Sequence, residues 1–268
     1  MYSLTHSHTV TVMKPFQILL LFAACLLISE GANIINGRIA APHSRPYMAY
    51  IKIRKGSQES ICGGTLIDSK WVVTAAHCEI PADEMMIILG AHSSNENAKE
   101  EGRQKFHVMK LLKHPYYDNN TLKNDILLME LNNTANFGEF VQNISLPETF
   151  EDIEEGTVCE TAGWGWTGKK FANRLMEVNV TILNRKLCQR HLKNAVSVTM
   201  NMMCTNVGPE GQDTCIGDSG GPLICNGVFR GILSFGTHPC GMRNGAAVYT
   251  RLTEEYITWI KNKIGHQH

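Results

Sequence analysis

The sequence predicts an all-β protein that ends in a single strong helix. From residue 34 onward, short apolar or alternating runs recur between turn residues, and no linker, repeat or low-complexity tract divides them. A chain of 268 residues is long enough for a sizeable core or for two compact halves. The 25 basic and 25 acidic residues balance, so the charge gives no support for nucleic-acid binding.

Alternation of apolar and polar residues marks the clearest strand, over residues 175–182. Its even-numbered positions, Met176, Val178, Val180 and Ile182, are apolar and would share one face, while the intervening positions are polar. Residues 85–89, 126–131 and 228–235 are further strand candidates.

The helix is predicted at the C-terminal end. Thr253 can cap it, acidic residues follow at its positive end, and lysines occupy its negative end. Ile257, Ile260 and Ile264 recur at helical spacing, so they are expected to dock the helix on the body of the protein.

Residues 1–31 are interpreted as an N-terminal extension and a secretory signal peptide. Lys14 precedes an apolar run over residues 16–28, and small residues flank Glu30 at the expected cleavage region. The run is shorter than the ~20 residues that span a bilayer, which favours a signal over a retained membrane anchor.

Nine cysteines are present, and Cys25 lies in the segment to be removed. The remaining even set indicates a disulfide framework in an exported protein, although spacing alone leaves 105 connectivities open. No Cys-x-x-Cys pair is present, which argues against a zinc site. We predict no metal and no cofactor. The eight cysteines are Cys62, Cys78, Cys159, Cys188, Cys204, Cys215, Cys225 and Cys240.

Three separate blocks carry the residue types of a nucleophilic hydrolase. Ser219 lies in GDSGGP (217–222), and its hydroxyl needs a base within hydrogen-bond reach to act as a nucleophile. His77, in TAAHC (74–78), is a candidate base, and Asp125, in NDILL (124–128), can orient it. The chain order His, Asp, Ser is that of chymotrypsin. Other histidines, such as His114 before Pro115, are expected to be loop or surface residues.

On these motifs the chain resembles the chymotrypsin/trypsin-like serine endopeptidases from residue 34 nearly to its end. The resemblance implies two six-stranded antiparallel β-barrels with the active site between them. It assigns Ser219 as the nucleophile, His77 as the general base and Asp125 as the residue that orients the imidazole. The backbone N–H groups of Gly217 and Ser219 would form the oxyanion hole. The implied disulfides are Cys62–Cys78, Cys159–Cys225, Cys188–Cys204 and Cys215–Cys240.

The resemblance also implies a substrate pocket for basic side chains. Asp213 would be the carboxylate at its base, which favours lysine or arginine, and Thr214 would add a hydroxyl. Ser234 and Gly236 match the strand that pairs with the substrate backbone. The usual second pocket glycine is Ala247, whose methyl group is expected to crowd the pocket.

Activation by cleavage before Ile34 is the third implication. The new ammonium group would pair with Asp218, so the uncut chain would be a zymogen. Residues 32–33 are Ala-Asn, with no basic residue at the cut. Such a dipeptide resembles the propeptides of granzymes and mast-cell proteases, which a dipeptidyl peptidase removes in secretory granules. A glutamate found in calcium-binding trypsins is replaced by Ala91, so no calcium is expected.

Four Asn-x-Ser/Thr sequons are candidate glycosylation sites in an exported chain, and the first is expected on a loop that overhangs the substrate cleft. They are Asn119, Asn132, Asn143 and Asn179.

The favoured function is a secreted, granule-stored endopeptidase of the granzyme A and K branch that cleaves proteins or peptides after Lys or Arg. Because all eight mature cysteines have partners, a monomer is expected, and serpins are candidate inhibitors. Three alternatives remain open on the sequence: a circulating protease similar to complement factor D, an inactive homologue that acts as a binding protein, and a membrane-tethered protease.

Overall fold

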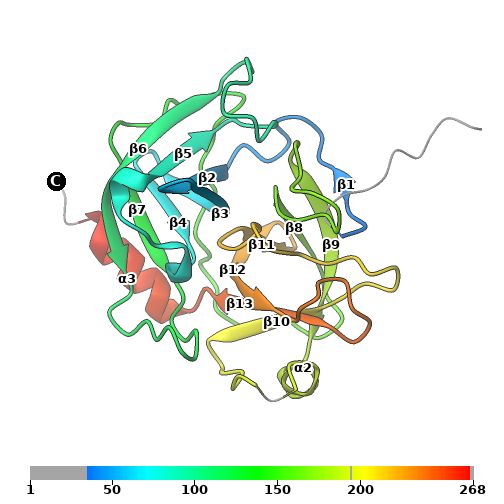
Figure 1. The fold of residues 1–268 in the computed structure, drawn as a ribbon. Helices are drawn as coiled ribbons and strands as arrows, with labels where there is room; N and C mark the ends of the chain where they lie inside the picture. The colour runs from blue at the N-terminus through cyan, green and yellow to red at the C-terminus, as the bar shows by residue number, and fades with distance from the viewer. Residues whose placement is uncertain (1–34, 194, 266–268) are drawn as a thin grey trace, which may run out of the picture. The chain divides into compact units, whose positions relative to one another are not determined.

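Six antiparallel strands close into a first barrel, in the order β2-β3-β4-β7-β6-β5 (Figure 1). The computed structural model describes residues 35–193 and 195–265, so the predicted signal peptide, the predicted activation dipeptide 32–33 and Ile34 lie outside the described residues. Apolar side chains such as Leu66, Val72 and Ile87 are fully buried inside this barrel. Its strands are β2 Met48–Lys55, β3 Gln58–Asp68, β4 Trp71–Thr74, β5 Met85–Leu89, β6 Gln104–Lys113 and β7 Leu127–Leu131.

A second set of six antiparallel strands forms the second barrel. Its order is β9-β10-β13-β12-β11-β8, and pairing of β8 with β9 closes it. A short strand, β1 (Arg38–Ile39), adds to the start of β9. The expected two-barrel fold is confirmed. The strands are β8 Val158–Gly163, β9 Met176–Leu183, β10 Met202–Asn206, β11 Pro222–Cys225, β12 Val228–Gly236 and β13 Ala246–Arg251.

The alternating pattern of β9 is confirmed, because its four even-numbered apolar residues are buried and Asn179 between them is exposed. The other three predicted strands correspond to β5, β7 and β12 within one residue at each end.

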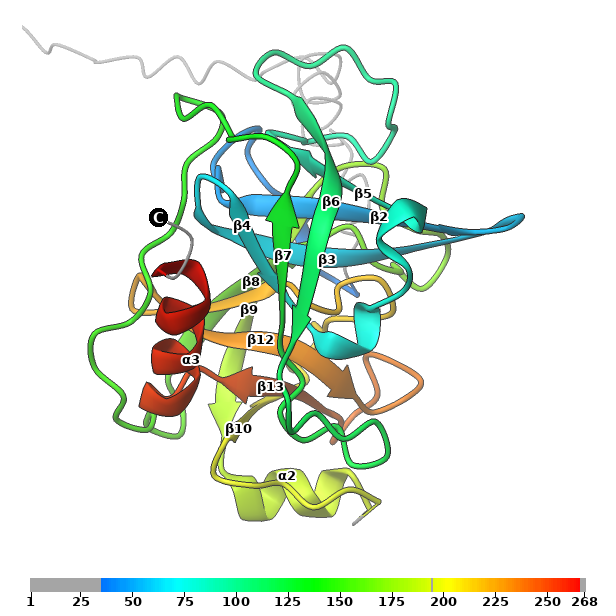
Figure 2. The same cartoon turned by 90° about the vertical axis from the view of Figure 1, so that its left-hand side faces the viewer.

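Helix α3 (Glu254–Gly265) begins where Thr253 was expected to cap it, and the Thr253 hydroxyl accepts a long hydrogen bond of 3.5 Å from the Tyr256 N–H. Ile257 and Ile260 are buried in a core that includes the first barrel, so the expected docking face is confirmed (Figure 2).

Two features differ from the sequence interpretation. His114 is only 4% exposed, because α3 covers it: its ring packs edge-on against Tyr256 and Trp259, with centroid distances of 5.3 and 5.0 Å. The sequence predicted a loop or surface residue, and His114 does lie in a loop directly after β6, but it is buried there. A short helix, α2 (Arg185–His191), was not predicted; the Asn184 side chain caps it by accepting from the Leu187 N–H at 2.8 Å.

All four implied disulfides are present. Cys62–Cys78 joins β3 to η1 (Ala76–Cys78), the single turn that carries His77. Cys215–Cys240 joins the loop before Ser219 to the loop after β12.

The backbone of the Ser219 loop contacts the first barrel directly. The Gly63 N–H of β3 donates to the Ser219 carbonyl at 2.7 Å, and the Thr74 hydroxyl donates to the Gly63 carbonyl at 2.8 Å. Gly220 follows with φ of +83°, and a Cβ there would lie 2.0 Å from Thr74 Oγ1 and 2.4 Å from the Gly63 oxygen. The two barrels therefore meet backbone to backbone next to Ser219.

We expect Gly220→Ala to lower the free energy of unfolding by about 2–4 kcal/mol, because it adds an unfavourable φ to an overpacked contact. Urea denaturation measures the change. The control is Gly227→Ala, which also has positive φ (+75°) but has no atom within 4 Å of its Cβ. This control should cost about 1 kcal/mol, and equal losses in the two variants would contradict the packing argument.

Candidate active site

His77 and Asp125 are held together by two hydrogen bonds on the first barrel. The His77 backbone N–H donates to Asp125 Oδ1 at 2.9 Å, and His77 Nδ1 lies 2.8 Å from Asp125 Oδ2. Asp125 is fully buried. Because an ionised carboxylate can only accept, Nδ1 carries the proton, which leaves Nε2 able to accept one.

Two residues of the second barrel also hold Asp125. The Ser234 hydroxyl donates to Asp125 Oδ2, and the Thr250 hydroxyl donates to the Asp125 carbonyl at 2.9 Å. Among the described residues, the Asp125 carboxylate oxygens are thus satisfied by hydrogen-bond donors, without a lysine or arginine beside them.

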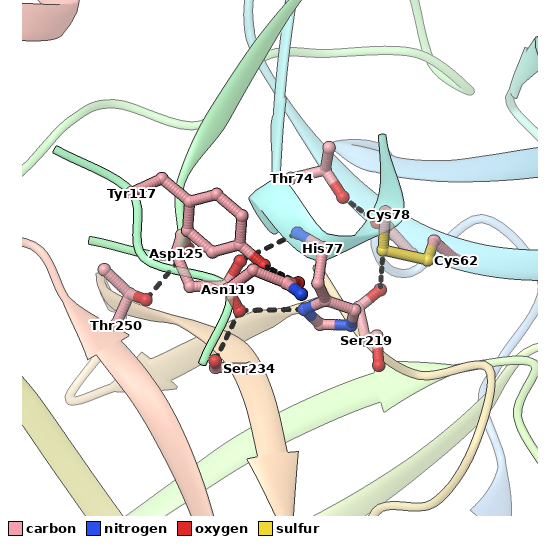
Figure 3. Close-up of polar contacts among 11 residues, drawn as sticks. Cys62, Thr74, His77, Cys78, Tyr117, Asn119, Asp125, Ser219, Ser234 and Thr250 are labelled. Atoms are coloured by element: carbon pink, nitrogen blue, oxygen red, sulfur yellow. Dashed lines mark hydrogen bonds and ion pairs between the residues drawn. A yellow bond between two sulfur atoms is a disulfide. The ribbon is translucent and has the colours of Figure 1, made fainter. Parts of the chain in front are cut away.

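Ser219 lies on the other side of the His77 ring from Asp125 (Figure 3). Ser219 and His77 line the same cavity, of about 320 Å³, which Ser234 and Gly236 also line. The structure therefore brings together the hydroxyl, the imidazole and the carboxylate that three distant segments supply.

The two expected oxyanion donors lie beside Ser219. Within residues 35–193 and 195–265, neither the Gly217 nor the Ser219 N–H has a backbone acceptor. Gly217 has φ of +97°, and a Cβ there would come within 2.9 Å of Ile61 Cγ1, so the turn requires glycine. Two free N–H groups next to a nucleophile can stabilise a developing oxyanion.

Asp218 is buried behind this turn, at 1% exposure. Its carboxylate accepts from the Gly165 N–H at 2.7 Å and from the Cys215 N–H at 3.0 Å. Burial raises the pKa of Asp218 to about 6, even though the two backbone donors lower it. Two donors are not enough to offset the loss of water around this carboxyl group.

Asp213 is also buried, at 3% exposure, and accepts from the Gly241 N–H at 2.9 Å. Burial raises the pKa of Asp213 to about 6 as well. Its neighbours Thr214 and Cys215 line the cavity, whereas Asp213 lies behind that lining. Among the described residues, no lysine or arginine forms an ion pair with Asp213.

Ala247 lies directly across from Gly236 in the β12–β13 pair. A Cβ built on Gly236 would lie 3.8 Å from the Ala247 Cβ, and the Ala247 side chain is 2% exposed, in an apolar cluster with Leu233 and Tyr249. The extra methyl group therefore lies within the second-barrel core, next to the strand that borders the cavity.

The bond from Ser234 to Asp125 was missed by the sequence interpretation, which gave Ser234 only a role in pairing with substrate. The two residues are 109 positions apart, and no local pattern links them. Leu122 and Ile216 were also missed as lining residues, and Ile216 is 58% exposed at the cavity.

The sequons differ in their surroundings. Asn119 and Asn179 are exposed, and the Tyr117 hydroxyl donates to Asn119 Oδ1 at 3.1 Å (Figure 3). Asn143 donates to the Ile67 carbonyl at 3.3 Å, and Asn132 is half-buried and accepts from the His107 N–H at 3.0 Å. Leu122, three residues after Asn119, lines the cavity, so this loop borders the site.

Comparisons with known proteins agree with this geometry. The family model described as Trypsin matches residues 34–260. Bovine granzyme A is 38% identical over 93% of this chain and 97% of its own length, and sheep mast cell protease 3 is 36% identical over 91% and 94%. Among solved structures, mouse neuropsin, a serine protease expressed in the limbic system of mouse brain, has a TM-score of 0.75 and 35% identity over 85% of this chain and 98% of its own.

The bond from Ser234 to Asp125 generates a test of the site. We expect Ser234→Ala to slow the reaction of Ser219 with a serine-directed phosphonate by about 10- to 100-fold, because a hydrogen bond to a charged group contributes about 1.5–3 kcal/mol. Mass spectrometry over time measures the rate, in protein whose chain begins at Ile34. Thr237→Ala, on the same cavity wall, is the control, and Ser219→Ala should not react. An unchanged rate in Ser234→Ala would contradict the role of this bond.

Proposed function

The chain belongs to the trypsin family of serine proteases, and we propose that it is an endopeptidase that cleaves after lysine or arginine. Ser219 attacks the peptide carbonyl while His77 Nε2 takes its proton and later gives it to the leaving amine. Asp125 stabilises the imidazolium that forms in between. The N–H groups of Gly217 and Ser219 bind the oxyanion of the tetrahedral intermediate, where one such donor is worth about 2.7–4 kcal/mol.

One observation carries the specificity proposal: behind the cavity wall, the buried Asp213 carboxylate has no cationic partner among the residues that the structure describes. Its pKa of about 6 records the cost of holding a charge away from water. A lysine or arginine side chain that enters past Thr214 would supply the missing cation and relieve that cost. An uncharged side chain would leave the carboxylate unpaired, so it is disfavoured.

We expect Asp213→Ser to reduce kcat/KM for arginine and lysine peptides by about 10²- to 10⁴-fold, because removing one partner of a buried ion pair costs about 3–5 kcal/mol. The measurement compares matched peptides that differ only in the residue before the cleaved bond. Cleavage of a leucine peptide is the control and should not fall in parallel. Retained cleavage after basic residues would show that the pocket is assigned wrongly.

The raised pKa of Asp213 predicts a pH dependence of substrate binding. Below about pH 6 the carboxyl group is protonated and no longer attracts a cation. KM for an arginine peptide should therefore rise as the pH falls through about 6, while KM for a peptide with a neutral side chain at that position changes less. Steady-state kinetics between pH 5 and pH 8 gives both values, and parallel curves would exclude Asp213 as the titrating group.

We also propose that the uncut chain is a zymogen. The carboxylate of Asp218 is buried among backbone donors, so an ammonium group beside it would be strongly favoured. The segment after the expected cut supports this proposal, because the Ile35 carbonyl accepts from the Asp213 N–H at 3.2 Å. Residue 35 thus lies against the stretch that leads to Asp218.

A chain that begins at Ile34 should be at least about 10²-fold more active than one that keeps residues 32–33 or carries an acetylated Ile34. The pairing raises the pKa of the ammonium group above its usual ~8, so the active form is fully present below that pH and is lost as the pH rises through the raised value. Activity of the three forms is measured with one peptide from pH 7 to pH 11. Full activity with a blocked terminus would refute this mechanism.

The proposed setting is a secretory granule. Its support is the similarity to granzyme A and mast cell protease 3, together with the Ala-Asn dipeptide that a dipeptidyl peptidase could remove. Within residues 35–193 and 195–265, no helix is long and apolar enough to cross a membrane. All eight cysteines after the signal peptide are paired within the chain, which supports a monomer. Serpins are the inhibitors we propose.

A further inference from the structure

A second cavity adjoins the substrate cavity on the second barrel. Its volume is about 460 Å³, and it lies between the end of α2 with the loop that follows and the loop that joins β12 to β13. It shares four wall residues, Phe235, Gly236, Thr237 and His238, with the cavity that holds Ser219. One short segment of chain therefore forms a wall of both cavities.

The second cavity is strongly basic. Arg190, Lys193 and Arg243 line it and are exposed, His191 and His238 add to the lining, and no aspartate or glutamate does among the described residues. In the described part of the chain, the ion pairs involve none of these three cations. The formal net charge of the whole chain is zero, so the charge here is local. We call this cavity the basic groove.

The N-terminal part of an extended substrate would reach the basic groove. The ladder between β11 and β12 ends at Ile232, so the edge of β12 from Ser234 to Gly236 is open on that side. An extended peptide can add to such an edge as an antiparallel strand. The reacting carbonyl of the peptide lies at Ser219. From there toward its N-terminus, the peptide would pass Ser234 and then Gly236 of the protein. Residues still nearer the N-terminus of the peptide would reach Thr237 and His238.

We propose that the basic groove binds acidic side chains of the substrate that lie roughly four to seven residues before the cleaved bond. The residue before the bond pairs near Ser234 and the third residue before it near Gly236, and each further residue advances the chain by about 3.3 Å. Asp or Glu residues beyond that point come within reach of Arg190, Lys193 and Arg243. This inference rests on the proposed endopeptidase function.

The lining favours a peptide over a sulfated polysaccharide. Apolar side chains make up much of the wall, including Leu192, Val196 and Met242, and these can pack against the stems of acidic residues. The groove is also continuous with the strand edge that binds the substrate backbone. A polysaccharide would use neither feature.

The experiment compares peptide pairs that carry either Asp and Glu or Asn and Gln at the fourth to seventh positions before the cleaved bond. One pair has arginine before that bond and a second pair has leucine. We expect kcat/KM to be about three- to tenfold higher for the acidic member of each pair, because two or three exposed ion pairs would add a binding free energy of that size. The ratio should approach one at about 0.5 M salt, because exposed charges are screened.

The triple variant Arg190→Gln, Lys193→Gln, Arg243→Gln should abolish this ratio and leave kcat/KM for the neutral peptide unchanged. The matched control is Lys99→Gln, Lys105→Gln, Lys110→Gln, which removes three exposed lysines from the first barrel and should keep the ratio.

Four outcomes would overturn the proposal. Two concern the ratio of kcat/KM between the acidic and the neutral peptide: a ratio of one in the unmodified protein, or a ratio that the triple variant keeps. The third is an equal loss of this ratio in the control variant, and the fourth is heparin binding that depends on the three cations without any preference for acidic peptides. If only the leucine pair is cleaved, the proposed preference for Lys or Arg fails. The ratio within that pair still decides whether the groove binds acidic residues.

Discussion

The contact between β3 and the Ser219 loop is the constraint on which the rest of the site depends. Ser219 belongs to one barrel and His77 to the other, so the mechanism proposed for them needs the two barrels in one fixed relation. The backbone hydrogen bond from the Gly63 N–H to the Ser219 carbonyl sets that relation at the loop itself, and the Thr74 hydroxyl holds Gly63 within the first barrel. Because no side chain intervenes between the two backbones, there is little freedom to shift, and preorganisation follows from packing.

Three buried aspartates near this contact differ in how many hydrogen-bond donors surround their carboxylates. The Asp125 carboxylate has three hydrogen-bonding partners: the His77 backbone N–H, His77 Nδ1 and the Ser234 hydroxyl. Asp213 and Asp218 have fewer donors, and burial raises the pKa of each to about 6. Under the proposed function, each of these two would gain from a cation supplied from outside the described residues: one from the substrate and one from the new chain end. Recognition and activation would then both depend on a buried carboxylate with too few hydrogen-bond partners.

Much of the fold could be predicted from the sequence because its signals are local. The alternation in β9 and the cap and apolar face of α3 lie within a few residues of one another. The triad was predicted from three motifs and their order. Closure of two barrels and the pairing of eight cysteines were available only through resemblance, since spacing does not specify them.

What the sequence could not predict depends on contacts between distant segments. His114 lies in a loop before Pro115, as predicted, but its burial was not predicted, because α3, which covers its ring, comes more than a hundred residues later in the chain. The bond from Ser234 to Asp125 crosses between barrels in the same way. Helix α2 has only seven residues, too few for a periodic pattern to stand out.

The wall formed by residues 235–238 has one more consequence. It separates two cavities while it belongs to both, and the Cys215–Cys240 disulfide anchors the chain just beyond it. A ligand that shifted this segment from one side would change the shape offered on the other, so the two proposed recognition events would be energetically coupled, and the coupling would be reciprocal. The factors in kcat/KM measured for single substrate positions would then not simply multiply. The selectivity for a whole peptide would be larger or smaller than their product.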